Sequence, residues 1–250
     1  MTVSRETKQQ EMRCRLATWL DVWNVEVDEA AVGRLVEFAF MLSAYKEANV
    51  VGTRDLDQIL ERHIADSLSC LLHQPSLNAH TLVDVGSGAG LPGLPLRMCL
   101  PRTNVTLVES TGKKTAFAEQ VVDRFELTDT HILNERAEDL GQNPECREKF
   151  DVATARALAS LPVVAEYCLP LVTVGGYVVA MKGRPTKEEL DQGARAAEVL
   201  GGKLEQVVDV PTLPEAEVRS RCLVVLKKET ETPRRYPRRV GLPRQNPLGT

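Results

Sequence analysis

The spacing of apolar residues changes near residue 80 and divides the chain into two kinds of segment. Upstream, apolar residues recur every three or four positions, which is typical of one buried face of a helix. Three helices are predicted there, with apolar stripes at Leu16, Trp19 and Leu20, at Val32, Leu35, Val36, Ala39 and Phe40, and at Leu60, Ile64, Leu68 and Leu71. Asp28 can cap the second helix, and Asp55 with Gln58 resembles a capping box for the third. We therefore expect an N-terminal helical extension over residues 1–78.

Downstream, short apolar runs of strand length alternate with helix-period segments. Strands are predicted at residues 81–85, 105–109, 130–133, 151–154, 177–181, 204–210 and 222–227, and helices at 94–100, 113–125, 160–169 and 186–200. This alternation predicts βαβ units and a parallel sheet. Gly175 and Gly176 indicate the turn into the fifth strand, and a proline-containing loop can close the last two strands into an antiparallel hairpin. The expected domain, over residues 79–228, is a Rossmann-like α/β fold with a mostly parallel seven-stranded sheet.

A glycine-rich turn, DVGSGAGLPG at residues 84–93, lies between the first predicted strand and the helix after it. Strand, glycine-rich turn and helix form the arrangement that holds a nucleotide-like ligand. Gly86, Gly88 and Gly90 remove side chains where the backbone turns sharply and a ligand approaches closely. The same pattern also occurs as a purely structural turn, so by itself it leaves both interpretations open.

Acidic residues end the first two predicted strands. Asp84 precedes the glycines, and Glu109 closes the second strand, about where a dinucleotide fold places its ribose-binding acid. An acid at both strand ends suits S-adenosylmethionine (SAM), because the second carboxylate can accept both ribose hydroxyls and the first can help to hold the amino-acid moiety. The alternative is two solvated acids beside a structural turn. A parallel sheet finished by an antiparallel hairpin is also the arrangement expected of a SAM-dependent methyltransferase.

Composition restricts the class of protein further. The 250 residues are 43% hydrophobic and 26% charged, as in a globular protein. No apolar run approaches the roughly 18 residues that span a bilayer, and the first residues lack the apolar region of a signal peptide. We expect a cytoplasmic protein with no membrane contact. The six cysteines are scattered without a CxxC pair, which predicts reduced thiols and no metal site.

A basic tail over residues 229–250 follows an acidic body. The net charge is −4, yet residues 227–250 carry seven basic side chains against two acidic ones. Four prolines in the tail predict an extended backbone without a helix. The candidate RNA-binding residues are Arg234, Arg235, Arg238 and Arg239 of the tail, together with Lys113 and Lys114 at a helix start. Two alternatives stay open: the tail can pack on the body through its apolar residues, and the two lysines can simply be solvated.

Motifs from about residue 30 to residue 248 together resemble one family. In chain order they are ILERHIADSL, LVDVGSGAGLPGLPL, LVESTGKK, NERAEDL, FDVATARALASL, MKG and RRYPRRVGLPRQNPL. They are similar to RsmG (glucose-inhibited division protein B), a family of bacterial methyltransferases that modify N7 of a guanosine in small-subunit (16S) ribosomal RNA. The resemblance implies a SAM-dependent rRNA methyltransferase with 16S rRNA or the assembling small subunit as partner. We expect a monomer.

The resemblance also implies which residues form the site. The cofactor-binding residues would be Asp84, Gly86, Gly88, Leu91, Glu109, Ser110, Thr111, Ala137, Glu138 and Arg156. Arg156 would face both cofactor and target base and is the catalytic candidate, with a surface ion pair as the alternative. His63, beside Arg62 and Asp66, is interpreted as a packing residue, with contact to the substrate pocket as the alternative.

The implied chemistry needs few catalytic groups. Guanine N7 is an acceptor with a free lone pair, so no general base, metal or covalent nucleophile is required. Proximity and orientation then supply the rate. Three other functions remain: a nicotinamide dehydrogenase, an RNA-binding protein that has the fold without the activity, and a methyltransferase of another RNA. The four tyrosines form no YxxxK pair, which disfavours the dehydrogenase.

Overall fold

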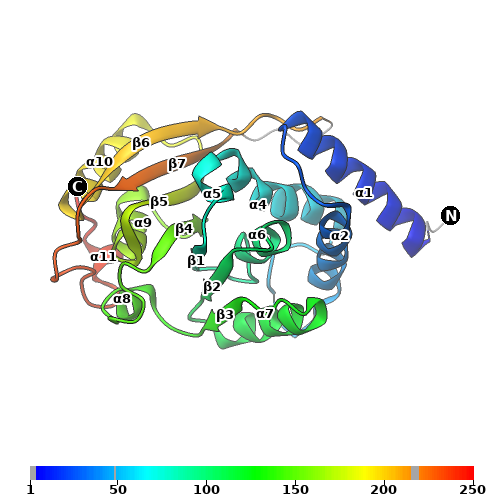
Figure 1. Ribbon diagram of the computed structural model, residues 1–250, viewed down its shortest axis with the longest axis horizontal. Helices are drawn as coiled ribbons and strands as arrows, with labels where there is room; N and C mark the ends of the chain where they lie inside the picture. The colour runs from blue at the N-terminus through cyan, green and yellow to red at the C-terminus, as the bar shows by residue number, and fades with distance from the viewer. Residues whose placement is uncertain (1–3, 48, 215–219) are drawn as a thin grey trace.

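One seven-stranded sheet forms the centre of the described part of the chain (Figure 1). The computed structural model describes residues 4–47, 49–214 and 220–250. The strands are β1 Thr81–Val85, β2 Asn104–Val108, β3 Thr130–Leu133, β4 Phe150–Arg156, β5 Val172–Gly183, β6 Gly202–Asp209 and β7 Arg221–Lys228. Their order is β3-β2-β1-β4-β5-β7-β6, with β7 antiparallel to β5 and β6 and all other pairs parallel. The predicted sheet with its late antiparallel hairpin is confirmed.

Alternating residues along each strand face two different cores. Leu82 of β1 packs with the N-terminal helices, whereas Val83 packs on the opposite face. The helices that follow the strands are α6 Gly93–Cys99, α7 Gly112–Phe125, α8 Ala137–Leu140, α9 Leu161–Cys168 and α10 Lys187–Val199. Residues of α6 and α7 share the core of the N-terminal helices, and residues of α8, α9 and α10 form the other core. Both faces of the sheet are therefore covered.

The strand order reverses between β1 and β4, which are neighbours in the sheet. The connections from β1 lead to β2 and β3 on one side, whereas β4 and β5 continue on the other. Such a switch point leaves a crevice outside the carboxyl ends of the strands, because the crossover helices diverge there. The fold thus places ligand-binding space beside the turn after β1.

The N-terminal helices form a cap on one face of the sheet (Figure 1). Helices α1 Arg5–Val22 and α2 Glu29–Ala44 bury the predicted stripes, and the Asp28 side chain accepts a hydrogen bond from the Ala30 amide as expected. The third predicted helix is instead a series of short pieces: α3 Leu56–Ile59, a π-helical turn at Leu60–Ala65, α4 Asp66–Leu68 and a 3₁₀ turn at Ser69–Leu72, followed by α5 Gln74–Leu77. Its apolar stripe is buried as predicted, but the expectation of one uniform helix is wrong.

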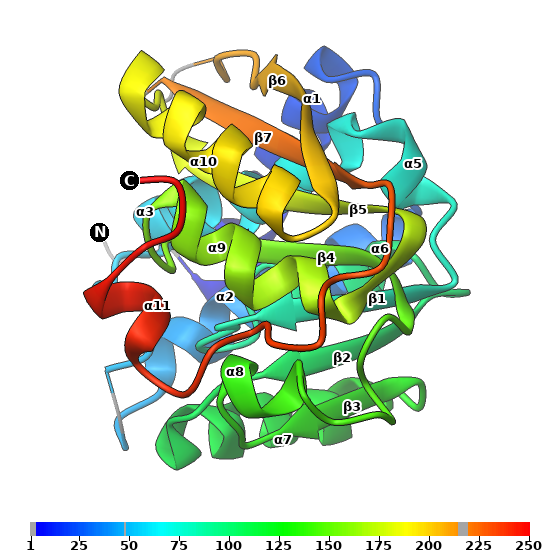
Figure 2. The ribbon, with the colours of Figure 1, turned by 90° about the vertical axis from the view of Figure 1, so that its left-hand side faces the viewer.

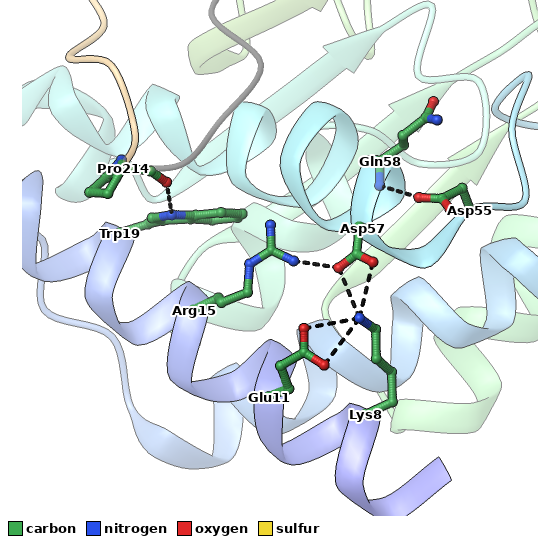
Figure 3. A network of polar contacts seen from close by, with 8 residues as sticks. All are labelled: Lys8, Glu11, Arg15, Trp19, Asp55, Asp57, Gln58 and Pro214. Atoms are coloured by element: carbon green, nitrogen blue, oxygen red, sulfur yellow. Dashed lines mark hydrogen bonds and ion pairs between the residues drawn. The ribbon is translucent and has the colours of Figure 1, made fainter. Parts of the chain in front are cut away.

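A polar network holds α1 against the rest of the cap (Figure 3). Lys8 donates to both Glu11 and Asp57, and Arg15 also pairs with Asp57 at the start of the third helical segment. The Trp19 indole donates to the Pro214 carbonyl at 3.2 Å, which ties α1 to the loop before β7. These contacts connect α1 to Asp57 in the rest of the cap and to Pro214 in the loop before β7, so the helix is held on two sides.

The strand β5 begins earlier than the sequence predicts. Gly175 and Gly176, interpreted as a turn, lie inside β5, where the pairing register to β4 shifts between Phe150 and Val152. Gly175 has a φ of 92°, a conformation that favours glycine. The two glycines therefore accommodate an irregularity within the strand rather than a separate turn.

The C-terminal arm, residues 229–250, folds back over the sheet (Figure 2). It runs along α9 and α8 and contains a short helix, α11 Leu242–Gln245, before its last residues. The prediction of a helix-free extended tail is wrong at α11, because Pro243 occupies the first turn, where its missing amide costs no hydrogen bond. Within the described residues, no helix is long and apolar enough to cross a membrane.

Candidate functional site

A cavity of about 270 Å³ lies at the carboxyl ends of β1 to β4. We call it the glycine-turn cavity. Six of the predicted cofactor residues line it: Gly86, Glu109, Ser110, Ala137, Glu138 and Arg156. These residues lie at or just after the carboxyl ends of β1, β2, β3 and β4, and the order of the strands brings them together. Gly86 has a φ of 72°, a conformation that favours glycine, and an added Cβ atom would also lie 2.5 Å from Cδ1 of Leu158 in the cavity wall.

Glu109 supports the glycine turn from the end of β2. Its carboxylate accepts hydrogen bonds from the Gly88 amide at 3.0 Å and from the Thr111 amide at 2.8 Å. Only 8% of Glu109 is exposed, yet the residue lines the cavity. A carboxylate has about four acceptor positions, so two remain for a ligand diol. The residue can therefore hold the loop and accept from a ribose at the same time.

Asp84 lies beneath the turn and not in the cavity. It is fully buried, and it accepts hydrogen bonds from the Gly93 amide at 2.8 Å and the Thr154 hydroxyl at 3.2 Å. Burial raises the pKa of Asp84 to about 7, although these two hydrogen bonds oppose the shift. In this structure Asp84 fastens the start of α6 to β4, and direct contact with a cofactor stays a prediction.

The remaining predicted residues of the turn support it without lining the cavity. Gly88 and Thr111 supply the amides that Glu109 binds. Leu91 is 4% exposed and packs in the core shared with the cap. It is therefore an apolar support for the turn.

Arg156 stands between the glycine-turn cavity and a second cavity of about 330 Å³. We call the second one the cap-side cavity, because the π-helical turn of the cap lines one side of it. Arg156, Ala157 and Leu158 line both cavities. Ala157 has a φ of 49°, an uncommon conformation that is often found at functional sites. The turn after β4 thus forms a shared wall.

The cap fixes the Arg156 guanidinium from three directions. The guanidinium donates to the Arg62 carbonyl at 3.2 Å and to the Asp66 carboxylate at 3.3 Å. One of its nitrogens also lies 2.9 Å from Nδ1 of His63. Burial and the nearby Arg156 charge lower the pKa of His63 to about 4, so the imidazole is neutral at pH 7. A neutral ring can accept at Nδ1. His63 therefore contacts the candidate catalytic arginine and lines the cap-side cavity, whereas its contact with the substrate stays a prediction.

The C-terminal arm reaches the glycine-turn cavity. Arg244 lines the cavity and donates to the Leu158 carbonyl at 2.9 Å, and the Gly241 amide donates to Glu138 at 2.9 Å. Tyr167 lines the cavity together with Arg244 and Glu138. The alternative of a tail packed on the body is therefore the one that the structure shows.

Buried polar contacts anchor the arm along its length. Arg238 forms an ion pair at 2.6 Å with Glu166, whose side chain is fully buried. Arg147 donates to the Thr232 and Tyr236 carbonyls at 2.6 and 2.7 Å. Of the candidate RNA-binding residues, Arg238 is occupied by Glu166, whereas those with exposed side chains are Arg234, Arg235, Arg239 and Lys113. Lys114 is half-buried and lines the glycine-turn cavity.

Several lining residues were not predicted. Glu135 and Arg136 directly precede the predicted Ala137 and belong to the same motif, NERAEDL, so the sequence could have indicated them. Tyr167 on α9 and Arg244 on the arm are far from the turn in sequence, and only the fold brings them to the cavity. Local motifs therefore identified the cavity residues near the strand ends but not those contributed by α9 and the C-terminal arm.

Solved structures share this fold at low sequence identity. The chain is similar to the structure of the [4+2]-cyclase SpnF, with a TM-score of 0.52, 15% identity and coverage of 79% of this chain and 93% of that one. It is also similar to the fibrillarin pre-rRNA processing protein of Methanococcus jannaschii, with a TM-score of 0.50, 14% identity and coverage of 63% and 70%. These likenesses concern the fold alone, because one fold can host unrelated functions.

Sequence relatives identify the family. The family model for rRNA small subunit methyltransferase G (GidB) matches residues 34–216. The chain is 46% identical over 230 residues to ribosomal RNA small subunit methyltransferase G of Rubrobacter xylanophilus, covering 92% of this chain and 88% of that protein. It is 37% identical over 244 residues to the protein of the same name from Acetivibrio thermocellus, covering 97% and 99%. The chain belongs to the rRNA small subunit methyltransferase G family, and the resemblance seen in the sequence is confirmed.

Proposed function

We propose that this protein transfers a methyl group from SAM to N7 of one guanosine in small-subunit ribosomal RNA. Family membership over most of the chain supports the rRNA substrate. The observation that carries the proposal is the pair of adjoining cavities with Arg156, Ala157 and Leu158 in their shared wall. Two ligands that must exchange a group need neighbouring sites, and this arrangement supplies them.

The residues of the glycine-turn cavity fit SAM. Glu109 keeps acceptor positions for the ribose hydroxyls, and Ala137 with Glu138 forms the side assigned to adenine. Bound SAM would supply an electrophilic methyl group on its sulfonium sulfur. Transfer of this methyl group leaves a neutral thioether. Guanine N7 already has a free lone pair, so the protein has no proton to remove before transfer. Its task is to orient the base and exclude water.

Arg156 is the proposed catalytic residue. Its guanidinium lies in the wall between the two cavities, and its contacts to Asp66 and His63 restrict its movement. A fixed donor at this place can hold the base in line with the methyl group, which is an effect of orientation. The exposed residues Arg234, Arg235, Arg239 and Lys113 are proposed to contact RNA phosphates.

The purified protein with methyl-labelled SAM and small-subunit RNA tests the proposal. We expect label in RNA, recovered after digestion as N7-methylguanosine. Label in another methylated nucleoside would contradict the N7 assignment, and the lack of any labelled product with both naked RNA and small subunits would contradict the proposed activity. An Arg156→Ala variant that binds SAM normally but transfers at least tenfold more slowly would support the role of Arg156.

A further inference from the structure

The cap-side cavity has walls of mixed charge that the proposed function has not yet used. The residues that carry charge there are Arg62, Asp66, Arg156, Lys182 and Arg221, and the neutral His63 lies among them. Its volume of about 330 Å³ lies in the range of small-ligand sites. Because it shares a wall with the glycine-turn cavity, a planar base in it would lie beside the reacting methyl group.

The charged groups are held in a fixed order. Arg156 forms part of the shared wall. Asp66 lies farther from that wall, and its carboxylate is 3.3 Å from the Arg156 guanidinium. The second Asp66 oxygen pairs with Nε of Arg221, also at 3.3 Å. Burial raises the pKa of Asp66 above its ordinary value, while the two guanidinium groups oppose that shift by favouring the carboxylate. Within the described ranges each carboxylate oxygen has one arginine partner, and it keeps a further acceptor position.

The π-helical turn explains why the cap supplies these groups. His63 lies within the turn at Leu60–Ala65, and Asp66 follows it directly. A π turn contains an extra residue per turn and is frequent at functional sites, because it rotates the side chains that follow. Here both His63 and Asp66 reach Arg156. The distortion therefore builds one wall of the cavity.

The order of groups matches the edge of guanine. Starting from N7, guanine presents the O6 acceptor and then the N1–H and N2–H₂ donors, whereas adenine presents an amino donor in place of O6 and an acceptor at N1. With N7 toward the shared wall, O6 faces the Arg156 donor and the N1 and N2 donors face the Asp66 acceptor. Adenine would oppose donor to donor and acceptor to acceptor.

We propose that the cap-side cavity is the binding site of the target guanine base and that Asp66 selects guanine there by accepting from N1–H and N2–H₂. The proposal rests on the proposed function, since it assumes a guanine whose N7 faces the glycine-turn cavity. Enzymes that modify a base commonly extrude it from its stack and recognise its Watson–Crick edge in a pocket. Asp66 is then a specificity-determining residue contributed by the cap.

Replacing the target guanosine by inosine tests the role of Asp66, because inosine lacks only the N2 amine. Once the methylated position is mapped, kcat/KM is measured on both RNAs. For the wild-type protein we expect inosine to be methylated about tenfold or more slowly, since Asp66 loses a donor. Asp66→Asn should methylate guanosine at least tenfold more slowly and discriminate little between the two RNAs. Asp191→Asn, at an exposed i,i+4 pair, should retain the wild-type ratio.

A second variant tests the cavity without changing its charges. Gly183 lines the cavity, and an added Cβ there meets no heavy atom within 4 Å. Alternation along β5 puts it on the same face as Met181, which packs in the core shared with the cap. Gly183→Leu should lower kcat/KM for RNA at least tenfold while the Kd for SAM and the melting temperature stay at wild-type values.

The possible failures can be told apart. A wild-type protein that forms no N7-methylguanosine overturns the proposed function and the base site with it. A second outcome concerns Asp66 alone. If the wild type methylates guanosine, and a folded Asp66→Asn variant keeps the wild-type ratio of kcat/KM for guanosine and inosine RNA, the role of Asp66 is overturned. Full activity of Gly183→Leu overturns the assignment of the cavity, whatever Asp66→Asn shows.

Discussion

Glu109 supports the glycine turn, and we propose that the same carboxylate binds the SAM ribose. It accepts from the Gly88 and Thr111 amides and lines the glycine-turn cavity. Glu109→Gln keeps the size of the side chain but removes its charge and one acceptor oxygen. We expect SAM binding to weaken by about 1.5–3 kcal/mol, the usual range for a hydrogen bond to a charged group. Calorimetric titration with SAM measures the change.

Glu135→Gln is the matched control for Glu109→Gln. Glu135 also lines the cavity but is exposed, and its replacement removes the same charge. We expect a much smaller effect on SAM affinity. Equal losses in both variants would mean that charge alone matters, and no loss in Glu109→Gln would refute the ribose contact.

Asp84 predicts a dependence of stability on pH. Burial raises its pKa from 3.8 to about 7 in the folded protein. Between these values the folded state binds more protons than the unfolded state, so this residue makes the free energy of unfolding fall as pH rises through that window, by about 4 kcal/mol at most. Asp84→Asn should remove this slope. Chemical denaturation between pH 5 and 7.5 compares the variant with the wild type and with Asp191→Asn, and parallel curves for all three would contradict the assignment.

At the scale of single residues, sequence reasoning placed the acids correctly but could not define their roles. Both Asp84 and Glu109 stand at strand ends as predicted. Their functions diverge because Asp84 lies under α6, whereas Glu109 reaches the cavity. That difference depends on which side of the turn each side chain occupies, and no local pattern records it.

The C-terminal arm is an element whose anchor can be tested directly. Arg238 neutralises Glu166, which is fully buried on α9. Arg238→Met would leave a buried carboxylate without its charged partner, and we expect a loss of about 3 kcal/mol in the free energy of unfolding. The adjacent Arg239 is exposed, so Arg239→Met should change stability by less than about 0.5 kcal/mol. Equal stabilities of the two variants, measured by urea denaturation, would show that the ion pair is unimportant.

The elements differ in how well local sequence predicts them. Strands and long helices were found within a few residues, since their apolar periodicity is strong. The π-helical turn at Leu60–Ala65 escaped prediction because an extra residue in one turn hardly alters a stripe of spacing three or four. Helices α8 and α11 have only four residues each and carry no periodic signal.

At the scale of the molecule, both cavities depend on contacts between distant parts of the chain. The cap supplies His63 and Asp66, the sheet supplies Arg156, and the arm supplies Arg244. The alternation of strands and helices predicted the sheet but not its strand order. The packing of cap and arm depends on buried pairs such as Arg238–Glu166, which sequence spacing does not reveal. The division into residues 1–78, 79–228 and 229–250 stays a prediction.

The most direct test of the central claim maps N7-methylguanosine in ribosomal RNA from cells with and without the gene. Reduction and strand scission reveal the modified base. We predict one guanosine of the small-subunit RNA that is cleaved in RNA from normal cells and from cells in which the wild-type gene is restored. Without the gene, or with the Glu109→Gln variant at low SAM supply, cleavage should be lost or reduced. Undiminished cleavage at every such guanosine after loss of the gene would contradict the account.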